Sequence, residues 1–455
     1  MGFLLDEQPI DSLDAWLATD VGGLGVARAQ ELGPAGTIAV LEASGLRGRG
    51  GGGFPTGRKW AGIADQRDTQ RYVVCNGAEG EPGTFKDRAL LRANPYQLVE
   101  GVIIAAFAIG AREAFICVKE RFELERAALV RAVQEMQAAG ICSDCRLTVV
   151  AGPDEYLFGE EKAMLEVIEG NEPLPRLLPP YEHGLFATQP QLGWQSHSGG
   201  SPGPHPTLVN NVETLSNVPH ILTRGADWFR GHGTAASPGT LVATITGDVC
   251  RSDVGEVELG TPLREVIDDV GGGLPPGRSV KAVFSGVANT VITGDQLDVP
   301  VSYEGFEAIG SGMGSAGFIV YDDTTCMVET AYRMSRFLSI ESCGQCPPCK
   351  LGSSAITERL ERIELGAGRA EDLDTIVGWL ERVTDGNRCF LAVEERQVVG
   401  SILAAFGSEF DEHLERGSCP RPRKLPIPKL LDLIDGHATY DERFWHKQPD
   451  WTYAD

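Results

Sequence analysis

The sequence lacks a long apolar run, a basic leader and an excess of positive charge, and each absence excludes a class of protein. Its most apolar stretch, "LVEGVIIAAFAIGA" at 98–111, contains Glu100 and is too short to cross a bilayer, so we expect a buried helix. Acids stand where an export signal has basic residues, which predicts a cytoplasmic protein that reaches a membrane only through partners. A formal net charge of −24 argues against binding to nucleic acid.

Eleven cysteines, an odd number, indicate metal or redox use rather than a disulfide framework. Cys343, Cys346 and Cys349 in "ESCGQCPPCKLG" have the C-x2-C-x2-C spacing that suits an iron-sulfur cube, and Cys389 in "DGNRCFLA" is the best candidate for a fourth ligand. A structural zinc site is the alternative, although zinc usually takes two ligands from each of two short knuckles.

The other cysteines carry weaker signals. Cys142 and Cys145 form a single C-x-x-C pair with no second pair to match it, so a pair without metal is the better interpretation. We expect most of the isolated cysteines to be packed thiols. These are Cys75, Cys117, Cys250, Cys326 and Cys419.

The pattern along the chain predicts several parts. Helical spacing fills the first forty residues, and alternating strands and helices then indicate an α/β sheet up to about residue 235, interrupted by a long loop at 182–206. A small β-rich domain with one helix follows from about 240, and a helical bundle begins near Cys326. After Cys419 we expect a Pro-rich, basic extension that wraps a neighbouring surface.

A glycine loop, "GLRGRGGGGFPTGRKW", offers backbone amides and basic side chains to a phosphate group. It lacks the G-K-[ST] ending of a nucleotide-hydrolysing P-loop. A flexible turn is the alternative, but it would not require the aromatic Phe54 or the lysine Lys59 that follow the glycines.

Three polar segments accompany this loop: "NGAEGEPGTFKDR", "YLFGEEKAM" and "LVNNVETL". Their carboxylates and amides can accept hydrogen bonds from ribose hydroxyls, ring N–H groups or a carboxamide. The alternatives are a solvated helix start for "GEEKAM" and a helix cap at Thr214.

Together these motifs resemble the flavoprotein component of NADH:quinone oxidoreductase, the family of 51 kDa or F-type subunits, which includes subunits of NAD-linked formate dehydrogenases and hydrogenases. The resemblance implies an α/β fold with a Rossmann-like domain for FMN and NADH at 1–237, including the N-terminal helices, and a ubiquitin-like β-grasp (SLBB) domain at 238–325. It also implies a four-helix [4Fe-4S] domain at 326–420 and a C-terminal extension at 421–455. The implied partners are a thioredoxin-like [2Fe-2S] subunit and further iron-sulfur subunits of a redox complex.

The same resemblance implies an NADH dehydrogenase-type activity. NADH would reduce FMN, and single electrons would leave through the cluster on Cys343, Cys346, Cys349 and Cys389. Glu81 and Glu161 would be the catalytic residues of the nicotinamide pocket. The residues implied for cofactor binding are Gly48, Gly50, Gly51, Phe54, Lys59, Asn76, Glu79, Tyr156, Gly159, Glu160, Tyr181, Asn210, Asn211 and Thr214.

The chain departs from the family mainly around the nucleotide. Ala78 replaces a usual carboxylate, Gly62 a common aromatic residue, Leu178 a usual lysine, and Tyr181 a usual phenylalanine. Two alternatives therefore stand beside the NADH-oxidising subunit: an electron-transfer subunit with another donor or acceptor, and an interaction subunit without flavin. The motifs indicate neither the terminal acceptor nor the direction of electron flow.

Overall fold

The structure is a computed structural model of the chain, and it describes residues 2–5, 8–68, 70–141, 144–187, 203–423 and 425–449. The chain divides into two compact units. The first consists of Met1–Gly80, Lys86–Val242 and Gly255–Gly260, and the second of Glu81–Phe85, Ala243–Val254 and Thr261–Asp455.

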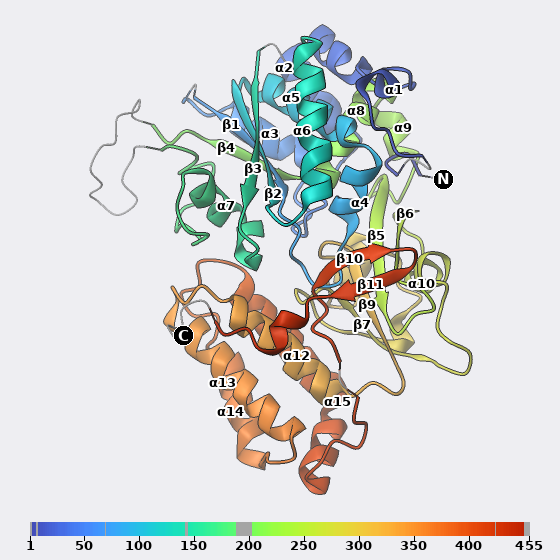
Figure 1. Cartoon of the computed structure of the whole chain (residues 1–455), viewed down its shortest axis with the longest axis vertical. Coiled ribbons are helices and arrows are strands. Elements are labelled where there is room, and N and C mark those ends of the chain that lie inside the picture. The colour runs from blue at the N-terminus through green and yellow to red at the C-terminus, as the bar shows by residue number, and fades with distance from the viewer. Residues whose placement is uncertain are drawn as a thin grey trace. The chain divides into compact units, whose positions relative to one another are not determined.

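A parallel four-stranded sheet organises the first unit (Figure 1). Its strands are β1 (Tyr72–Gly77), β2 (Glu113–Lys119), β3 (Arg146–Gly152) and β4 (Thr207–Asn211), in the order β3-β2-β1-β4. From β1 the chain builds the sheet outward through β2 and β3, and β4 then pairs with the other edge of β1. A change of direction of this kind opens a crevice at the carboxyl ends of β1 and β4, where α/β sheets bind ligands.

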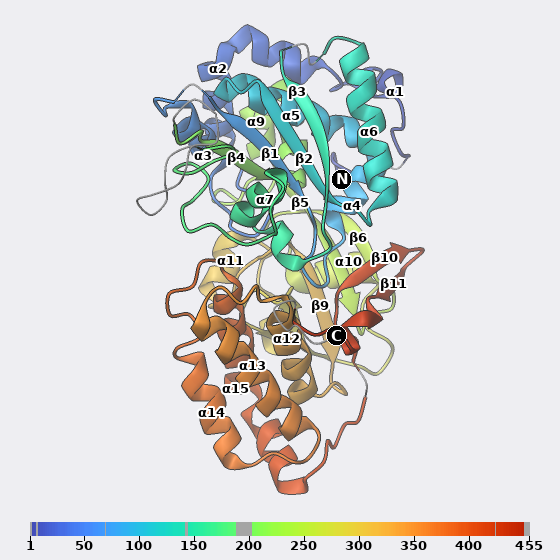
Figure 2. The same ribbon diagram turned by 60° about the vertical axis from the view of Figure 1, so that its left-hand side comes forward.

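Helices cover both faces of this sheet (Figure 2). On one face α5 (Pro95–Ile109) and α8 (Val212–Arg224) pack against the strands and each other, and α2 (Leu24–Ser44) packs on both helices. On the other face α7 (Glu161–Ile168) and the short helix η1 (Tyr156–Gly159) close a hydrophobic core. The unit also contains α1 (Leu13–Leu17), α3 (Thr56–Ala64), α4 (Lys86–Ala93), α6 (Glu123–Ala138) and α9 (Ala226–Arg230).

Helix α5 confirms the buried helix expected at 98–111. Its single acid, Glu100, is buried and accepts hydrogen bonds from the indole of Trp16 and the backbone N–H of Gly23, both at 2.8 Å. These partners explain how an apolar helix tolerates a buried carboxylate. Within the described part of the chain, no helix has both the length and the apolar character that crossing a bilayer requires.

The expected β-rich region is a mixed five-stranded sheet in the order β6-β5-β9-β7-β8. Its strands are β5 (Thr240–Gly247), β6 (Asp253–Glu258), β7 (Val280–Ser285), β8 (Ile292–Thr293) and β9 (Gly317–Asp322). Two helices accompany it, α10 (Leu263–Gly271) and α11 (Tyr303–Ala308), together with the short η2 (Gly294–Gln296). The expectation of one helix was wrong, because Ser302 caps a short additional helix by accepting the Gly305 N–H at 3.0 Å.

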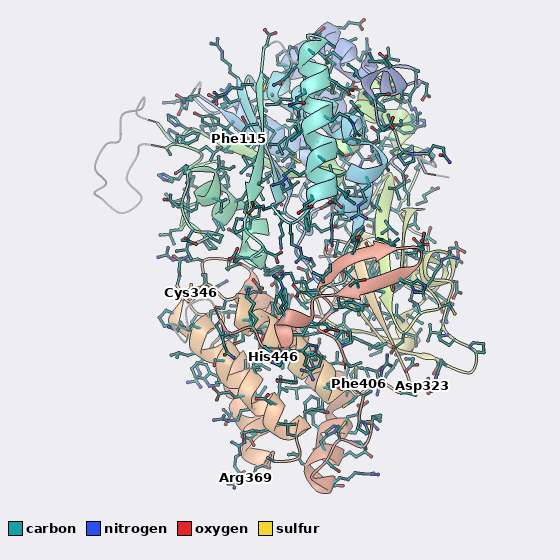
Figure 3. All side chains as sticks on the ribbon, viewed as in Figure 1. Phe115, Asp323, Cys346, Arg369, Phe406 and His446 are labelled. Carbon is teal, nitrogen blue, oxygen red and sulfur yellow. The ribbon has the colours of Figure 1, made fainter. Side chains whose placement is uncertain are left out.

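The expected helical bundle consists of α12 (Met327–Glu341), α13 (Pro347–Glu364), α14 (Ala370–Leu380) and α15 (Leu391–Arg416). Figure 3 shows Cys346 and Arg369, which flank the two ends of α13, at opposite ends of the bundle. The C-terminal extension is more regular than expected, because it forms a hairpin of β10 (Leu430–Ile434) and β11 (His437–Tyr440) followed by η3 (Glu442–Trp445). It also covers α12, where the ring of Phe444 packs on Phe337 at 5.4 Å.

Candidate functional site

A cavity of about 620 Å³ lies in the first unit at the switch point of the parallel sheet. Asn76 and Asn211 are register partners at the carboxyl ends of β1 and β4, and both line the cavity. Asn210 also lines it and is held in place by the indole N–H of Trp60, which donates to its side-chain oxygen at 2.8 Å. The sheet therefore delivers three amide side chains to one crevice, as its topology predicts.

The glycine loop forms one wall of this cavity, and hydrogen bonds to carbonyl groups of the same loop hold it in shape. The Gly48 N–H donates to the Phe54 carbonyl at 2.9 Å, and the Arg47 guanidinium donates to the Gly53 carbonyl at 2.7 Å. Gly50 approaches β4 so closely that an added Cβ would lie 3.0 Å from the Cβ of Asn211. Gly51 has a φ of 116°, a conformation that side chains disfavour. Two of these glycines thus have a steric reason to be glycine.

The N-terminus of α8 opens onto the same cavity. Asn211 caps the helix by accepting the Glu213 N–H at 3.0 Å, and Thr214 accepts the backbone N–H of Arg49 at 2.8 Å. The N–H groups of a first helical turn and the helix dipole make such a terminus favourable for an anion. The helix-cap interpretation of this motif was correct in kind, but Asn211 rather than Thr214 is the cap.

Behind Asn211 lies a buried charge network that the sequence reasoning missed. Lys86 contacts Glu213 at 2.9 Å and Asp87 at 2.8 Å, and it donates to the Asn211 side-chain oxygen at 3.1 Å. Asp87 accepts from the Asn211 side-chain nitrogen at 2.7 Å. Burial lowers the pKa of Lys86, but Asp87 and Glu213 raise it well above its ordinary value, so the amine stays charged. The network fixes which way the Asn211 amide faces.

Lys59 and Glu161 face each other at the cavity wall. Lys59 lies on α3 and Glu161 on the first turn of α7, and their charged atoms are 3.3 Å apart. Both side chains line the cavity and are partly exposed. The residue expected to hold a phosphate therefore contacts the residue expected to serve the nicotinamide.

Two exposed aromatic rings complete the wall. Phe54 and Tyr181 both line the cavity although about half of each residue is accessible. The Arg58 guanidinium lies over the Phe54 ring at 5.9 Å. Exposed rings beside polar side chains offer flat surfaces on which a planar heterocycle can stack.

Most of the expected cofactor-binding and catalytic residues line this one cavity. They are Gly48, Gly50, Phe54, Lys59, Asn76, Gly159, Glu161, Tyr181, Asn210, Asn211 and Thr214. Gly51, Glu79, Tyr156 and Glu160 are not among its lining residues, and Glu81 lies in the second unit, where it accepts the Val287 N–H at 2.6 Å. Arg58, one of the basic side chains of the glycine loop, and Gly62, which replaces a common aromatic residue, also line the cavity. The lining further includes residues that the motifs did not single out for contact: Gly52, Gly53, Ile63, Gln66, Pro180, Thr207 and Val209.

Glu79 and Glu160 have local partners that explain their positions. The Glu79 carboxylate is almost fully buried and paired with Arg88 at 3.1 Å, and its pKa is raised by burial and by Asp87. Glu160 caps α7 by accepting the N–H groups of Lys162 and Ala163, each at 2.9 Å. Burial raises the pKa of Glu160 to about 6. The helix-start interpretation of "GEEKAM" therefore accounts for Glu160.

The candidate cluster cysteines come from two loops at one end of the helical bundle. Cys343 and Cys346 lie between α12 and α13, Cys349 lies in the first turn of α13, and Cys389 stands just before α15. The two loops are joined by a hydrogen bond from Arg388 to the side-chain oxygen of Gln345 at 3.2 Å.

The surroundings of these thiols suit a thiolate-bound group. The Gln345 side-chain amide lies 3.6 Å from the Cys343 sulfur, and the Ser342 hydroxyl lies 3.4 Å from that of Cys349. Hydrogen-bond donors beside cysteine sulfurs are typical of the thiolates that hold an iron-sulfur cluster.

The expectation that most of the isolated cysteines are packed thiols is confirmed. Cys75, Cys117 and Cys326 are buried, whereas Cys250 is exposed. Cys326 and Cys419 are not isolated, because they lie close together in the bundle. Cys142 lies outside the described residues, so the pair with the buried Cys145 is not described.

Both implied groups fit the residues present. The cavity has the volume of a cofactor site, with a glycine, Gly50, whose added Cβ would crowd Asn211, a helix N-terminus, a lysine and aromatic walls. The bundle supplies four cysteines in the three-plus-one arrangement typical of a [4Fe-4S] cluster. This fold and these sites define the class: an oxidoreductase subunit that carries a flavin and an iron-sulfur cluster.

Comparisons with known proteins agree with this class. Residues 41–220 match the Nuo51 FMN-binding domain, and residues 329–413 match the NADH-ubiquinone oxidoreductase-F iron-sulfur binding region. The second F-type subunit of NADH-quinone oxidoreductase in Rhizobium meliloti (strain 1021) is 37% identical over 394 residues, covering 84% of this chain and 90% of that protein. The NADP-reducing hydrogenase subunit HndC of Solidesulfovibrio fructosivorans is 36% identical, covering 90% and 82%.

A solved structure extends the agreement to the fold. The crystal structure of an NAD+-reducing [NiFe]-hydrogenase in the air-oxidized state matches with a TM-score of 0.75 and 32% identity, covering 92% of this chain and 68% of that one. The chain belongs to the family of F-type subunits of NADH-quinone oxidoreductases. It is an electron-entry subunit with FMN and a [4Fe-4S] cluster, takes NADH as substrate and works with partner subunits.

Proposed function

We propose that NADH is oxidised in the cavity at the switch point. Lys59, Glu161 and the amide side chains each bind a different part of the ligands. The single observation that carries this proposal is the convergence of eleven of the expected residues on one cavity in the first unit. Bound FMN supplies the chemistry by accepting two electrons as hydride and releasing them one at a time.

The chain's own groups bind and orient the cofactor. The glycine loop and the N-terminus of α8 present N–H groups to the phosphate, and Lys59 balances its charge. Asn211, fixed by Lys86 and Asp87, and Asn76, whose amide donates to the Gly159 carbonyl at 2.7 Å, orient the polar part of the ligand. Glu79 is assigned a supporting role, because its carboxylate is committed to Arg88.

Glu161 is the carboxylate best placed to accept a hydrogen bond from the dinucleotide. It lines the cavity and is partly exposed, and a carboxylate near the ribose accepts its hydroxyl but repels a 2′-phosphate. We therefore expect NADH to be preferred over NADPH, although the name of the relative HndC refers to NADP. The assignment of Glu81 to the same pocket stays a prediction.

Electrons would leave through Cys343, Cys346, Cys349 and Cys389 toward a thioredoxin-like [2Fe-2S] subunit and further iron-sulfur subunits. We infer a cytoplasmic location, since the described cysteines form no disulfide and a thiolate cluster suits a reducing compartment. The division into parts at 1–237, 238–325, 326–420 and 421–455 stays a proposal, supported by the two family regions that fall within the first and third parts.

Stopped-flow titration of flavin reduction with NADH and NADPH tests the proposal. The FMN-loaded protein should lose its yellow absorbance within milliseconds to seconds of mixing with NADH, and only slowly with NADPH. Absence of bleaching at any NADH concentration would contradict the proposal and favour a subunit of the same fold with a different donor.

A further inference from the structure

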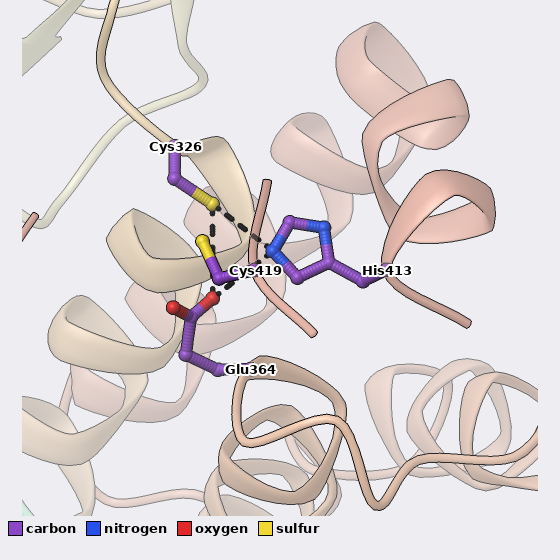
Figure 4. Close-up of side chains that lie close together, drawn as sticks. All are labelled: Cys326, Glu364, His413 and Cys419. Atoms are coloured by element: carbon purple, nitrogen blue, oxygen red, sulfur yellow. Dashed lines mark hydrogen bonds and ion pairs between the residues drawn. The ribbon is translucent and has the colours of Figure 1, made fainter. Parts of the chain in front are cut away.

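A second group of metal-binding side chains lies in the helical bundle, apart from the four cluster cysteines. Cys326, Glu364, His413 and Cys419 each offer one ligand atom, and these four atoms lie within 4.8 Å of one another (Figure 4). Cys326 and His413 are almost fully buried, and Glu364 and Cys419 are partly buried. None of the motifs of the family resemblance includes these residues.

The separations among the Cys326, His413 and Glu364 ligand atoms match those around a tetrahedral ion. The Cys326 sulfur lies 3.3 Å from the His413 Nε2 and 3.7 Å from a Glu364 oxygen, and that oxygen lies 3.3 Å from the His413 Nε2. Tetrahedral zinc with ordinary bond lengths separates nitrogen from oxygen by roughly 3.4 Å, and sulfur from either of them by roughly 3.6 Å. Two thiols, an imidazole and a carboxylate are also ligands that zinc prefers.

The histidine is oriented as metal-bound histidines are. Its Nδ1 lies 2.6 Å from the backbone carbonyl of Glu409, which requires a proton on Nδ1 and leaves Nε2 facing the two sulfurs and Glu364. Hydrogen bonding of the outer ring nitrogen to a carbonyl fixes the tautomer in metal sites. The N–H of Glu329 also points at the Cys326 sulfur, at 3.4 Å, as expected for a thiolate acceptor.

Each of the four residues lies at or just beyond the end of a helix, and the opposite end of that helix lies next to a cluster cysteine. Cys326 caps the start of α12, Glu364 ends α13, His413 lies in the last turn of α15, and Cys419 follows that helix. The cluster cysteines lie at the opposite end of each of these helices. At 1.5 Å per residue, the 15 residues of α12 separate the two groups by roughly 22 Å.

We propose that Cys326, Glu364, His413 and Cys419 bind one Zn²⁺ ion. This ion stabilises the end of the bundle that lies opposite the cluster cysteines. With all four positions taken by protein, the site has the closed coordination of structural zinc and no place for a substrate. The ion would join three helices to the segment that follows α15. Its distance from the cluster and the redox inertness of zinc assign it a structural role and no part in electron transfer.

The first test is metal analysis of the full-length protein, purified with its cluster and washed with a chelator. We expect about one zinc per chain by mass spectrometry, and less than a fifth of that amount in Cys326→Ser and His413→Gln. Cys250→Ser is the matched control because Cys250 is an exposed thiol of the same unit, and it should keep its zinc. Cys343→Ser should lose iron but keep zinc.

The second test needs no variant. Zinc K-edge absorption spectroscopy of the wild-type protein should show two sulfur ligands near 2.3 Å and two nitrogen or oxygen ligands near 2.0–2.2 Å. Zinc that is absent from the wild-type protein, that is bound by four sulfurs, or that disappears with Cys343→Ser would overturn the proposal. A disulfide between Cys326 and Cys419, detected by mass mapping without reduction, would overturn it as well.

Discussion

At the scale of single residues, the function depends on side chains whose charge is balanced by one identifiable partner. Glu161 is the clearest case, because it meets Lys59 at 3.3 Å and still faces the cavity. Glu161→Gln keeps the size of the side chain and removes its charge. We expect flavin reduction by NADH to slow by about tenfold or more, while flavin content stays the same.

Stopped-flow absorbance and released FMN measure the two quantities separately. Glu172→Gln is the control, because Glu172 is an exposed acid outside the cavity lining. If Glu161→Gln changes neither quantity, the assignment of Glu161 to the nicotinamide pocket is wrong.

His220 predicts a pH dependence of stability. It is buried in α8 with Nε2 3.1 Å from the Gln97 side-chain oxygen, and burial, aided by Arg224, lowers its pKa to about 3. Between about pH 3 and the ordinary value near 6.5, the His220 imidazole binds a proton in the unfolded chain but stays neutral in the folded chain. Stability from this site is therefore complete above pH 6.5 and declines below it, by up to about 1.4 kcal/mol per pH unit.

His220→Gln removes this titration. From pH 6.5 to pH 5, the wild-type protein should lose about 1.6 kcal/mol more unfolding free energy than the variant does. Urea unfolding followed by tryptophan fluorescence measures this difference, and Trp16 lies beside His220 as a reporter. Equal losses in the two proteins would mean that His220 is already charged when folded.

At the scale of elements, α3 contains two glycines with opposite surroundings. Gly62 lines the cavity, and a Cβ there would meet nothing within 4 Å, whereas a Cβ on Gly57 would lie 2.5 Å from the backbone nitrogen of Glu42. Gly62→Ala should therefore raise the unfolding free energy by about 0.5–1 kcal/mol, since alanine loses less backbone entropy in a helix.

Gly57→Ala provides the matched control in the same helix and should lower the unfolding free energy, because α2 and α3 would have to separate. Chemical unfolding of both variants measures the two effects. Stabilisation by both substitutions, or by neither, would contradict this description of α3.

The sequence predicted elements better than it predicted contacts. Regular spacing of apolar residues located the parallel sheet, α5 and the bundle, because periodicity reflects burial directly. It could not show that Glu79 pairs with Arg88 or that Lys86 supports Asn211, since such pairs depend on tertiary packing. It also could not bring together Cys326 and Cys419, which are far apart in the sequence and meet only when α12 and α15 pack.

At the scale of the whole molecule, the two proposed cofactor sites belong to separate compact units. The cavity proposed for FMN is lined by the first unit alone, and the four cysteines proposed as cluster ligands all lie in the second. Cys389→Ser should therefore abolish cluster binding and leave flavin content and flavin reduction by NADH unchanged. Iron analysis and flavin absorbance measure this, with Cys250→Ser as the control. Loss of flavin together with iron would show that the units load cooperatively.

The ion pair between Lys59 and Glu161 has a consequence for the order of assembly. Without an anion nearby, each charge neutralises the other, and the lysine occupies part of the carboxylate's capacity to accept hydrogen bonds. A flavin phosphate would compete for the lysine and leave the carboxylate freer to accept from a sugar hydroxyl, so binding of the flavin would favour binding of the dinucleotide. The dinucleotide should therefore bind weakly to the flavin-free chain, which would protect reduced nucleotide from unproductive capture before the subunit is complete.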